Sequence, residues 1–445
     1  MLFGGARLGS LTVSRLGLVL LGGCFNPSDP QAGSLTDGAD STTTTSGSGP
    51  TSSTMTTEPT SMTLDSTATT MPSTSDASVT ATATATGTGT DESSTGEVSD
   101  CPGGDPTPGV APYVLTVVIA AEDTDDVDVG DINGDGDLDL INLSRITTSV
   151  ETFFGDGAGG FVSDGVTELG MNGFPDTVRL GAIADDTVDL FVHMEGPVEL
   201  WVVRGDGAGN WPNPQVYAGT YVRAIDLADL NGDTVLDLAY VGASYLEVRL
   251  GEAAESYGAS VLYGENFGNV VRTADLSGDG NLDILTAGYG ATELQIYSGV
   301  GDGSFQAEPT VVTGSPIAGI DVGQFDGDGL LDLVLTTEED LRVFYGEAGG
   351  GTSSTPGTII PGGLGRVRVA DIDANGIDDL VTHASDAIVI RFSQGDATFS
   401  DAMPFPCAAY VRSVDVGDFN EDCVPDLVAP QGPGEDLCVL LSDRD

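Results

Sequence analysis

A short acidic phrase recurs seven times in this 445-residue chain, and this repeat limits the possible folds more than any other feature. A clear copy reads Asp131-Ile-Asn133-Gly-Asp135-Gly-Asp137-Leu-Asp139. The copies begin at residues 131, 181, 229, 275, 324, 371 and 418, so neighbouring copies are 46 to 50 residues apart. A fixed period of this length indicates that one structural unit is repeated along the chain.

Each unit contains short apolar and β-branched runs separated by turn residues, and none has the length or spacing of a helix. A second phrase, Gly-Asp-Gly, follows about 25 residues after the first, at 154–161, 205–211 and 301–305. In the unit that starts at Asp275 the predicted strands are 270–276, 282–287, 294–297 and 310–312. Four strands in each of seven units predict an all-β fold, a seven-bladed β-propeller.

The two ends of the repeat region predict how the ring closes. After the last acidic phrase only 427–429 and 437–441 read as strands, so this unit lacks its outer strand. An extra run, Tyr113–Ile119, precedes the first phrase. We expect this N-terminal strand to complete the last blade, which would leave no free sheet edge.

The acidic phrase and the Phe-Gly-Asp-Gly phrase at 154–157 together resemble the FG-GAP/VCBS repeat family. Propellers of this family also occur at the N-terminus of integrin α chains. The resemblance covers residues 113–445 and implies the propeller fold, but it specifies function poorly.

The acidic loops have the composition of calcium sites. Side-chain oxygens stand at loop positions 1, 3, 5 and 9, and a backbone carbonyl is available at position 7. Glycine at positions 4 and 6 permits a tightly wound backbone, and clustered hard oxygens suit Ca²⁺. The candidate ligands are Asp131, Asn133, Asp135, Asp137, Asp139, Asp229, Asn231, Asp233, Val235, Asp237, Asp275, Ser277, Asp279, Asn281, Asp283, Gln324, Asp326, Asp328, Leu330, Asp332, Asp371, Asp373, Asn375, Ile377, Asp379, Asp418, Asn420, Asp422, Val424 and Asp426.

The seven loops differ in quality. Neutral Gln324 at position 1 predicts weaker binding in the fifth copy, and the second copy keeps only Asp185 and Asp189 and should be empty. The sequence therefore predicts about six structural Ca²⁺ sites, each holding the turn between the first and second strands of a blade. The alternative for each loop is an Asx-rich turn without metal.

The N-terminus reads as an export signal. Arg7 and Arg15 precede a short apolar run, and Leu-Gly-Gly-Cys24 resembles the lipobox of bacterial lipoproteins. The resemblance implies removal of residues 1–23, a lipid anchor on Cys24 and a position in the bacterial envelope, at the outer membrane or cell surface. An ordinary cleaved signal with an incidental cysteine is the alternative.

A tether separates this signal from the globular part. Between residues 41 and 99, 34 of 59 residues are Ser or Thr, and almost none can be buried, so we expect a disordered segment over 24–100. The predicted organisation is a signal at 1–23, this tether, and a propeller at 101–445.

Four cysteines remain after Cys24, an even number in an exported chain. Four cysteines allow three pairings. The expected strand order favours Cys101–Cys423 and Cys407–Cys438, because each pair would meet on one face of the closing blade.

Charge excludes one class of partner. The chain has no lysine, 14 arginines and 69 acidic residues, a net charge of −55. Residues 101–445 hold 59 of the acids and 12 of the arginines, so this part carries −47. Such a domain lacks the basic surface that nucleic acids require.

No catalytic motif is evident, and the two histidines, His193 and His383, lie in different units. We therefore predict a calcium-stabilised surface module for binding or adhesion, without catalysis, that takes a protein or glycan on one rim and meets the membrane only through its anchor. By resemblance to integrin propellers, that rim is the one opposite the calcium loops. The alternatives are a carbohydrate-active enzyme, a lyase or hydrolase with paired carboxylates, and a structural envelope protein.

Arg204-Gly205-Asp206 spells an integrin-recognition tripeptide, but it falls in the repeated turn and is expected to be coincidental.

Overall fold

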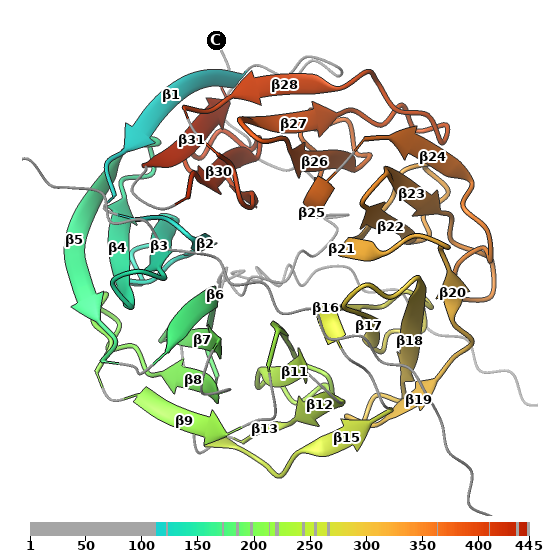
Figure 1. Ribbon diagram of the computed structural model, residues 1–445, viewed down its shortest axis with the longest axis horizontal. Coiled ribbons are helices and arrows are strands. Elements are labelled where there is room, and N and C mark those ends of the chain that lie inside the picture. Colours follow the sequence, from blue (N-terminus) through green and yellow to red (C-terminus); the bar gives the residue numbers. More distant parts are fainter. Residues whose placement is uncertain are drawn as a thin grey trace, which may run out of the picture. The chain divides into compact units, whose positions relative to one another are not determined.

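Short strands arranged radially make up the protein in the computed structural model, and no helix occurs among its described residues (Figure 1). The structure describes residues 113–442 except 122, 171–172, 184–186, 196–198, 213, 219–221, 243–244, 253–255, 265–267, 363, 409 and 433–435. No helix there is long and apolar enough to cross a membrane. Seven sheets surround a common axis, which confirms the predicted all-β, seven-bladed propeller.

The first four blades follow one another along the chain, each with its strands numbered from the axis outward. Blade 1 is β2 (Asp126–Gly130), β3 (Asp139–Ser144), β4 (Ser149–Gly155) and β5 (Phe161–Glu168). Blade 2 is β6 (Phe174–Gly181), β7 (Asp189–Glu195), β8 (Glu199–Val203) and β9 (Pro214–Ala218). Blade 3 is β10 (Ala224–Ala228), β11 (Asp237–Val241), β12 (Leu246–Arg249) and β15 (Val261–Tyr263), with a small hairpin of β13 (Gly251–Glu252) and β14 (Ser256–Tyr257). Blade 4 is β16 (Gly268–Ala274), β17 (Asp283–Gly288), β18 (Glu293–Gly299) and an outer edge split into β19 (Phe305–Ala307) and β20 (Val311–Val312).

The remaining three blades complete the ring. Blade 5 is β21 (Ile317–Gly323), β22 (Asp332–Thr337), β23 (Asp340–Phe344) and β24 (Thr358–Pro361). Blade 6 is β25 (Leu364–Ala370), β26 (Asp379–His383), β27 (Ala387–Arg391) and β28 (Met403–Pro406). Blade 7 is β29 (Asp415–Gly417), β30 (Asp426–Pro430), β31 (Leu437–Ser442) and, outermost, β1 (Tyr113–Ile119). The outer strand predicted at 310–312 is thus only the second half of the blade 4 edge, because Phe305–Ala307 also pairs with β18.

The ring closes as predicted, with the first strand of the repeat region on the last blade. β1 pairs antiparallel with β31, from Tyr113 opposite Ser442 to Ile119 opposite Leu437. Closure in this way pairs strands from opposite ends of the domain, so that unravelling either end opens the ring.

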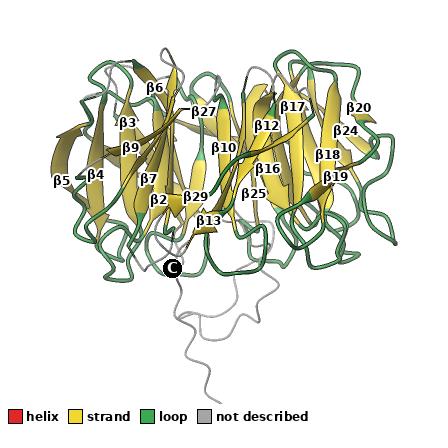
Figure 2. Ribbon diagram, turned by 90° about the horizontal axis from the view of Figure 1, so that it is seen from below, coloured by secondary structure: helices red, strands yellow, loops and turns green. Residues whose placement is uncertain are grey.

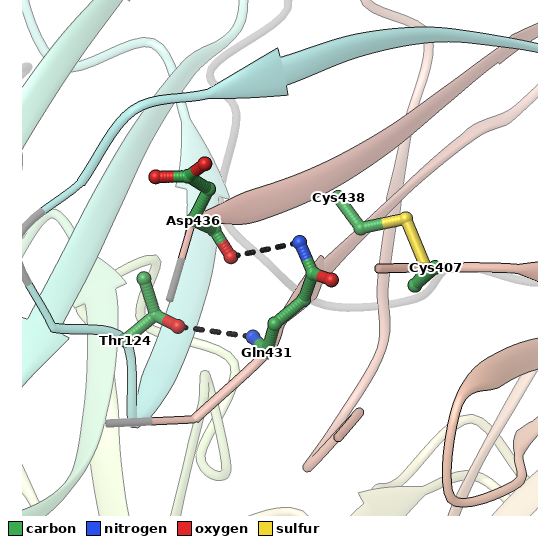
Figure 3. Close-up of a disulfide and its surroundings, with 5 residues drawn as sticks. All are labelled: Thr124, Cys407, Gln431, Asp436 and Cys438. Carbon is green, nitrogen blue, oxygen red and sulfur yellow. Dashed lines mark hydrogen bonds between the residues drawn. A yellow bond between two sulfur atoms is a disulfide. The ribbon is translucent and has the colours of Figure 1, made fainter. Parts of the chain in front are cut away.

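A disulfide and side-chain hydrogen bonds reinforce this closing blade (Figure 3). Cys407, just after β28, is bonded to Cys438 on β31, with 5.9 Å between their Cα atoms, which confirms that predicted pair. Thr124, just before β2, accepts a hydrogen bond from the backbone N–H of Gln431 at 2.9 Å, and so joins blade 1 to blade 7. Cys423 is also disulfide-bonded, while its predicted partner Cys101 lies outside the described residues.

Apolar side chains fill the space between blades. The second strands are the most buried: all six residues of β3, β17 and β22 are buried, and each core cluster joins residues of neighbouring blades. Burial on both faces explains why these strands read as continuous apolar runs rather than alternating ones.

Charged residues, by contrast, ring the axis. The residue two places before the end of each innermost strand forms what we call the axial ring: Asp128, Arg179, Asp226, Arg272, Asp321, Arg368 and Asp415. Asp and Arg alternate around it from blade to blade. Arg272 Nε lies 2.9 Å from Asp321 Oδ1, and Arg368 Nε lies 3.1 Å from Asp415 Oδ1. These ion pairs connect blade 4 to blade 5 and blade 6 to blade 7.

The axial aspartates also hold the next blade through its backbone. Asp128 accepts a hydrogen bond from Leu180 N at 2.6 Å, and Asp226 accepts one from Thr273 N at 2.6 Å. Asp321 similarly accepts one from the next blade, from Val369 N at 3.0 Å. Each bond satisfies an N–H on the inner edge of a sheet, where no further strand is available to accept it.

An odd number of blades prevents complete alternation, and the mismatch falls where blade 7 meets blade 1. There Asp415 and Asp128 are neighbours in the axial ring, and their side chains interact directly. Burial raises the pKa of Asp128 well above its usual value; Arg179 opposes the rise and Asp415 adds to it. Because the folded-state pKa is raised, the contribution of Asp128 to stability is fully present below the pKa of the unfolded chain and is lost as the pH rises.

We therefore expect Asp128→Asn to stabilise the protein at pH 8. The amide removes one of two like charges and can still accept the hydrogen bond from Leu180 N. The unfolding free energy should therefore rise at pH 8, and the gain should shrink as the pH falls toward 4 and Asp128 becomes protonated. Urea melts at both pH values measure it. The control is Asp321→Asn, which removes the charged partner of Arg272 and should destabilise the protein. The role given to Asp128 would be contradicted if Asp128→Asn did not stabilise the protein at pH 8, or if Asp321→Asn stabilised it as well.

Candidate functional site

Each acidic loop lies between the first and second strands of a blade, and five of the loops are wound around their first aspartate. Asp131 Oδ1 accepts a hydrogen bond from Gly134 N at 2.7 Å, and its Oδ2 accepts one from Gly136 N at 3.0 Å. Gly134 and Gly136 have φ of 77° and 99°, a left-handed backbone that favours glycine. Asp229, Asp275, Asp371 and Asp418 accept equivalent bonds in their own loops. The aspartate at the first loop position therefore shapes the loop.

The last aspartate of the loop is the most constant feature of the ring, because it is buried in all seven blades. One oxygen accepts a hydrogen bond from a backbone N–H of the loop, and the other accepts one from the chain at the end of the third strand. In blade 1, Asp139 accepts these bonds from Ile132 N and Gly155 N, both at 2.9 Å. The residues are Asp139, Asp189, Asp237, Asp283, Asp332, Asp379 and Asp426, and none is more than 2% exposed.

In six of the seven blades this buried carboxylate has no arginine beside it. Among the described residues, no ion pair reaches Asp139, Asp237, Asp283, Asp332, Asp379 or Asp426. Burial raises the pKa of the first four of these to about 6, of Asp426 to about 7 and of Asp379 to about 8. The raised values express the cost of burying a negative charge without a cation.

Blade 6 holds a possible acidic metal-binding cluster. Oxygens of Asp371, Asp373 and Asp379 lie within 4.8 Å of one another. The rise in the pKa of Asp379 comes mainly from burial, and the charges of Asp373 and Asp371 add to it. Three carboxylate oxygens facing one point are a donor set that fits a hard divalent cation.

Blade 2 is the exception, and there an arginine supplies the positive charge. Arg204 NH1 lies 2.6 Å from Asp189 Oδ2, and Gly205 N donates to Asp189 Oδ1 at 3.1 Å. Asp206 accepts hydrogen bonds from Ala208 N and Asn210 N. All three residues of the Arg204-Gly205-Asp206 tripeptide thus have local structural partners.

The blade 2 loop also begins one residue later than its sequence suggested. Gly181 pairs with Asp189 across β6 and β7, just as Gly130 pairs with Asp139 in blade 1. Gly181 is therefore the end of the strand and not the first loop residue, so the loop is one residue shorter than the others. Asp185, the other acid retained in this copy, lies outside the described residues.

In blade 5, Gln324 stands at the first loop position. Its backbone N–H donates to Asp378 of blade 6 at 2.7 Å, and its side chain provides no carboxylate to wind the loop. The rest of the loop keeps the turn seen in the other blades, since Leu330 N donates a hydrogen bond to Asp328 Oδ1 at 2.8 Å. Weaker metal binding by this loop stays a prediction.

The Gly-Asp-Gly phrase builds the turn between the third and fourth strands, next to the acidic loops. Gly209 of blade 2 has φ of 81°, and a Cβ atom there would stand 2.5 Å from Phe154 of blade 1. Gly159 approaches Leu441 of blade 7 in the same manner, and its N–H donates to Phe419 O at 2.8 Å. The Gly-Asp-Gly turns therefore make contacts between neighbouring blades. The sequence period revealed the phrase but did not predict these contacts.

The face opposite the acidic loops has a different character. All four exposed aromatic side chains among the described residues lie there, in connections between second and third strands or at the start of a blade: Phe174, Tyr245, Tyr289 and Tyr410. The guanidinium of Arg145 lies 5.8 Å from the ring of Phe174, and that of Arg223 lies 5.5 Å from the ring of Tyr289. Figure 2 shows the two loop-bearing faces from the side. This face therefore combines exposed aromatic rings with arginine side chains.

Comparison with known proteins agrees with this architecture. The FG-GAP-like repeat family matches three overlapping stretches, residues 275–335, 324–382 and 371–429. A seven-bladed ring with acidic turns after its inner strands defines a repeat propeller. Residues 275–429 consist of FG-GAP-like repeats, as the sequence motifs implied, and they form part of a seven-bladed β-propeller.

Solved structures share the fold at low identity. One is BBS1N in complex with ARL6DN, with a TM-score of 0.56, 12% identity and coverage of 75% of this chain and 98% of the other. Another is an Agrocybe aegerita lectin that recognises non-reducing terminal N-acetylglucosamine, with a TM-score of 0.51, 16% identity and coverage of 71% of this chain and 85% of the other. No curated protein matches the chain.

The arginine in blade 2 gives a direct test of the buried carboxylates. Arg204→Gln should destabilise the protein by about 3 kcal/mol, because it leaves Asp189 buried without its positive partner. Added Ca²⁺ should not restore this loss, since the loop lacks the other ligands. The matched control is Arg145→Gln, whose ion pair with Asp176 is half-exposed and should be worth less than about 1 kcal/mol. Equal losses in urea melts of the two variants would contradict the role given to Arg204.

Proposed function

We propose that the protein is a calcium-stabilised binding module, without catalytic activity, that presents the face opposite its acidic loops to a ligand. The observation that carries the calcium part is the contrast between blade 2 and the other six. Where the loop has lost its acids, Arg204 faces the buried aspartate. Where the acids remain, the described residues place no side-chain cation there, and a bound Ca²⁺ would supply the missing charge.

The residues that would hold the ion are the side chains at positions 1, 3, 5 and 9 of six loops, with the carbonyl at position 7. Blade 6 supports this best, through Asp371, Asp373 and Asp379. Bound Ca²⁺ would neutralise the buried carboxylates and fix the turn that begins each second strand. Its role in the proposal is structural.

The binding part of the proposal is supported by the placement of exposed aromatic side chains on one face. The fold itself is compatible with binding, since one similar structure is a lectin and another is a protein held in a complex. In keeping with the export signal, we propose that Cys24 anchors the chain in the bacterial envelope and that the ligand is a protein or glycan at the surface.

The enzyme alternative would need a reactive pair of carboxylates. Asp128 and Asp415 face each other at the axis, but Asp128 accepts a hydrogen bond from Leu180 N and Asp415 pairs with Arg368. Both acids are therefore engaged in holding blades together. The exposed aromatic side chains that could seat a sugar lie on the rim instead, which favours binding without catalysis.

Chelation tests the calcium proposal. Removal of Ca²⁺ with EGTA should lower the melting temperature by about 10 °C or more, because each kcal/mol of unfolding free energy lost lowers it by about 2–4 °C in a large domain. Asp373→Asn should reduce the calcium-dependent shift in melting temperature by about one sixth, because it weakens one of about six sites. Calorimetric titration of the unsubstituted protein with Ca²⁺ should count about six bound ions. A melting temperature unchanged by EGTA would overturn this part of the proposal.

An array of glycans and surface proteins tests the binding proposal. The full-length protein should bind a restricted set of ligands in Ca²⁺ and lose them in EGTA, because the loops hold the blades that present the face. Tyr289→Ala should weaken binding about tenfold, as expected for an aromatic hot spot. Absence of any ligand in Ca²⁺, or turnover of a glycan substrate, would refute a non-catalytic binding module.

A further inference from the structure

One arginine on the proposed binding face differs from every other arginine that the structure describes. Of these eleven residues, Arg223 alone is exposed. It forms no ion pair with a described residue, and its guanidinium lies against the ring of Tyr289, which is 76% exposed. In a domain with a net charge of −47, an accessible and unneutralised guanidinium is unusual.

Backbone contacts fix both members of this pair. Arg223 N donates a hydrogen bond to Val241 O at 2.7 Å, directly before β10 of blade 3. Tyr289 lies in the tight turn after β17 of blade 4, where Ala291 N donates to Gly288 O at 3.0 Å. The pair thus spans the junction of two blades on rigid supports, and little ordering would be needed when a ligand binds.

A second tyrosine extends this surface. Tyr245 is 40% exposed and occupies the turn of blade 3 that follows Val241. Gly242 N donates to Tyr245 O at 3.3 Å, which closes that turn beside the strand end that carries Arg223. Two exposed tyrosines and one exposed arginine therefore stand on this face of blades 3 and 4.

Similar aromatic and arginine side chains occur at two other blade junctions, but there the charge is already neutralised. Arg145 lies against Phe174 and is paired with Asp176 at 3.0 Å. Arg412, two residues after the exposed Tyr410, is paired with Asp125. Among the described residues, only the junction of blades 3 and 4 offers an available positive charge beside an exposed ring.

The charge of the domain limits what this position can attract. A polyanion would meet the surrounding acidic surface, and such repulsion is screened only beyond about 8 Å at physiological salt. A ligand with a single anionic group can approach Arg223 without that penalty. A carboxylate would also match the planar guanidinium with two parallel hydrogen bonds.

The flat exposed tyrosine rings specify the rest of the ligand. The apolar face of a sugar ring can lie on such a surface while its hydroxyl groups stay in water. We propose that Arg223, Tyr289 and Tyr245 form a subsite for one carboxylate-bearing sugar residue, of the uronic acid class, on an otherwise neutral glycan. This inference rests on the proposed function and adds the class of ligand to it.

Binding of simple glycosides tests the subsite. Methyl glucuronide is titrated against the full-length protein in Ca²⁺ and compared with methyl glucoside and with the methyl ester of methyl glucuronide. The acid should bind about tenfold more tightly than either neutral probe, as expected for a charge-assisted bidentate contact. The preference should decline as NaCl is raised.

Variants assign the effect to this junction. Arg223→Gln should remove the preference for the acid and leave the neutral probes unchanged, whereas Tyr289→Ala should weaken acid and neutral probes alike. The matched controls are Arg145→Gln and Tyr410→Ala, which alter the same face elsewhere and should change binding less than twofold. Melting temperatures of all four variants in Ca²⁺ establish that each is folded.

The possible failures can be told apart. Equal binding of acid and neutral probes, no binding of any probe, or equal effects of Arg223→Gln and Arg145→Gln would overturn the uronic acid subsite. If the array still yields a ligand in that case, the binding module stands and only the ligand class is wrong. If no ligand of any kind binds, the proposed function fails as well.

Discussion

A buried aspartate at the end of the first turn holds every blade of this propeller together. In each of the seven blades its two oxygens accept hydrogen bonds from the turn before it and from the chain after the third strand, as Asp139 does with Ile132 and Gly155. One residue thereby fixes the positions of three strands. The same residue creates the main electrostatic problem of the fold, because a buried carboxylate needs a positive partner. Arg204 in blade 2, and the acidic loops of the other six blades as proposed sites for Ca²⁺, are two answers to that problem.

The axial ring obeys a related constraint that depends on the number of blades. Alternating charges can join neighbours all the way around a ring only when the number of members is even. With seven members, one like-charged pair is unavoidable, and here Asp415 and Asp128 form it. The mismatch lies where blade 7 meets blade 1, and blade 7 is also the blade that β1 completes and that the Cys407–Cys438 disulfide ties to the end of blade 6. The weakest contact at the axis thus coincides with the most strongly tied blade at the periphery.

The sequence predicted the features that repeat and missed those that depend on exact register. The period revealed the blades, the closing strand Tyr113–Ile119 and the acidic loops, because each is written locally in every unit. The axial ring could not be found from the period. Its members lie three residues before the start of the acidic phrase in six blades, but the blade 2 loop is one residue shorter, so the same count there reaches Val178 instead of Arg179. The partner of Asp189 was also missed, since Arg204 lies 15 residues further on and only the strand pairing brings the two together. The aromatic face could not be predicted either, because its residues come from unrelated connections.

These charge arrangements divide the molecule by function. On one face, acids are concentrated in loops where a cation would be gained; at the axis, acids and arginines balance almost completely; on the opposite face, Arg145 and Arg412 are neutralised by Asp176 and Asp125. Arg223 is left as an accessible positive charge on a strongly negative domain. An excess of acid elsewhere makes that single charge more selective, because it disfavours any ligand that carries more than one negative group near it.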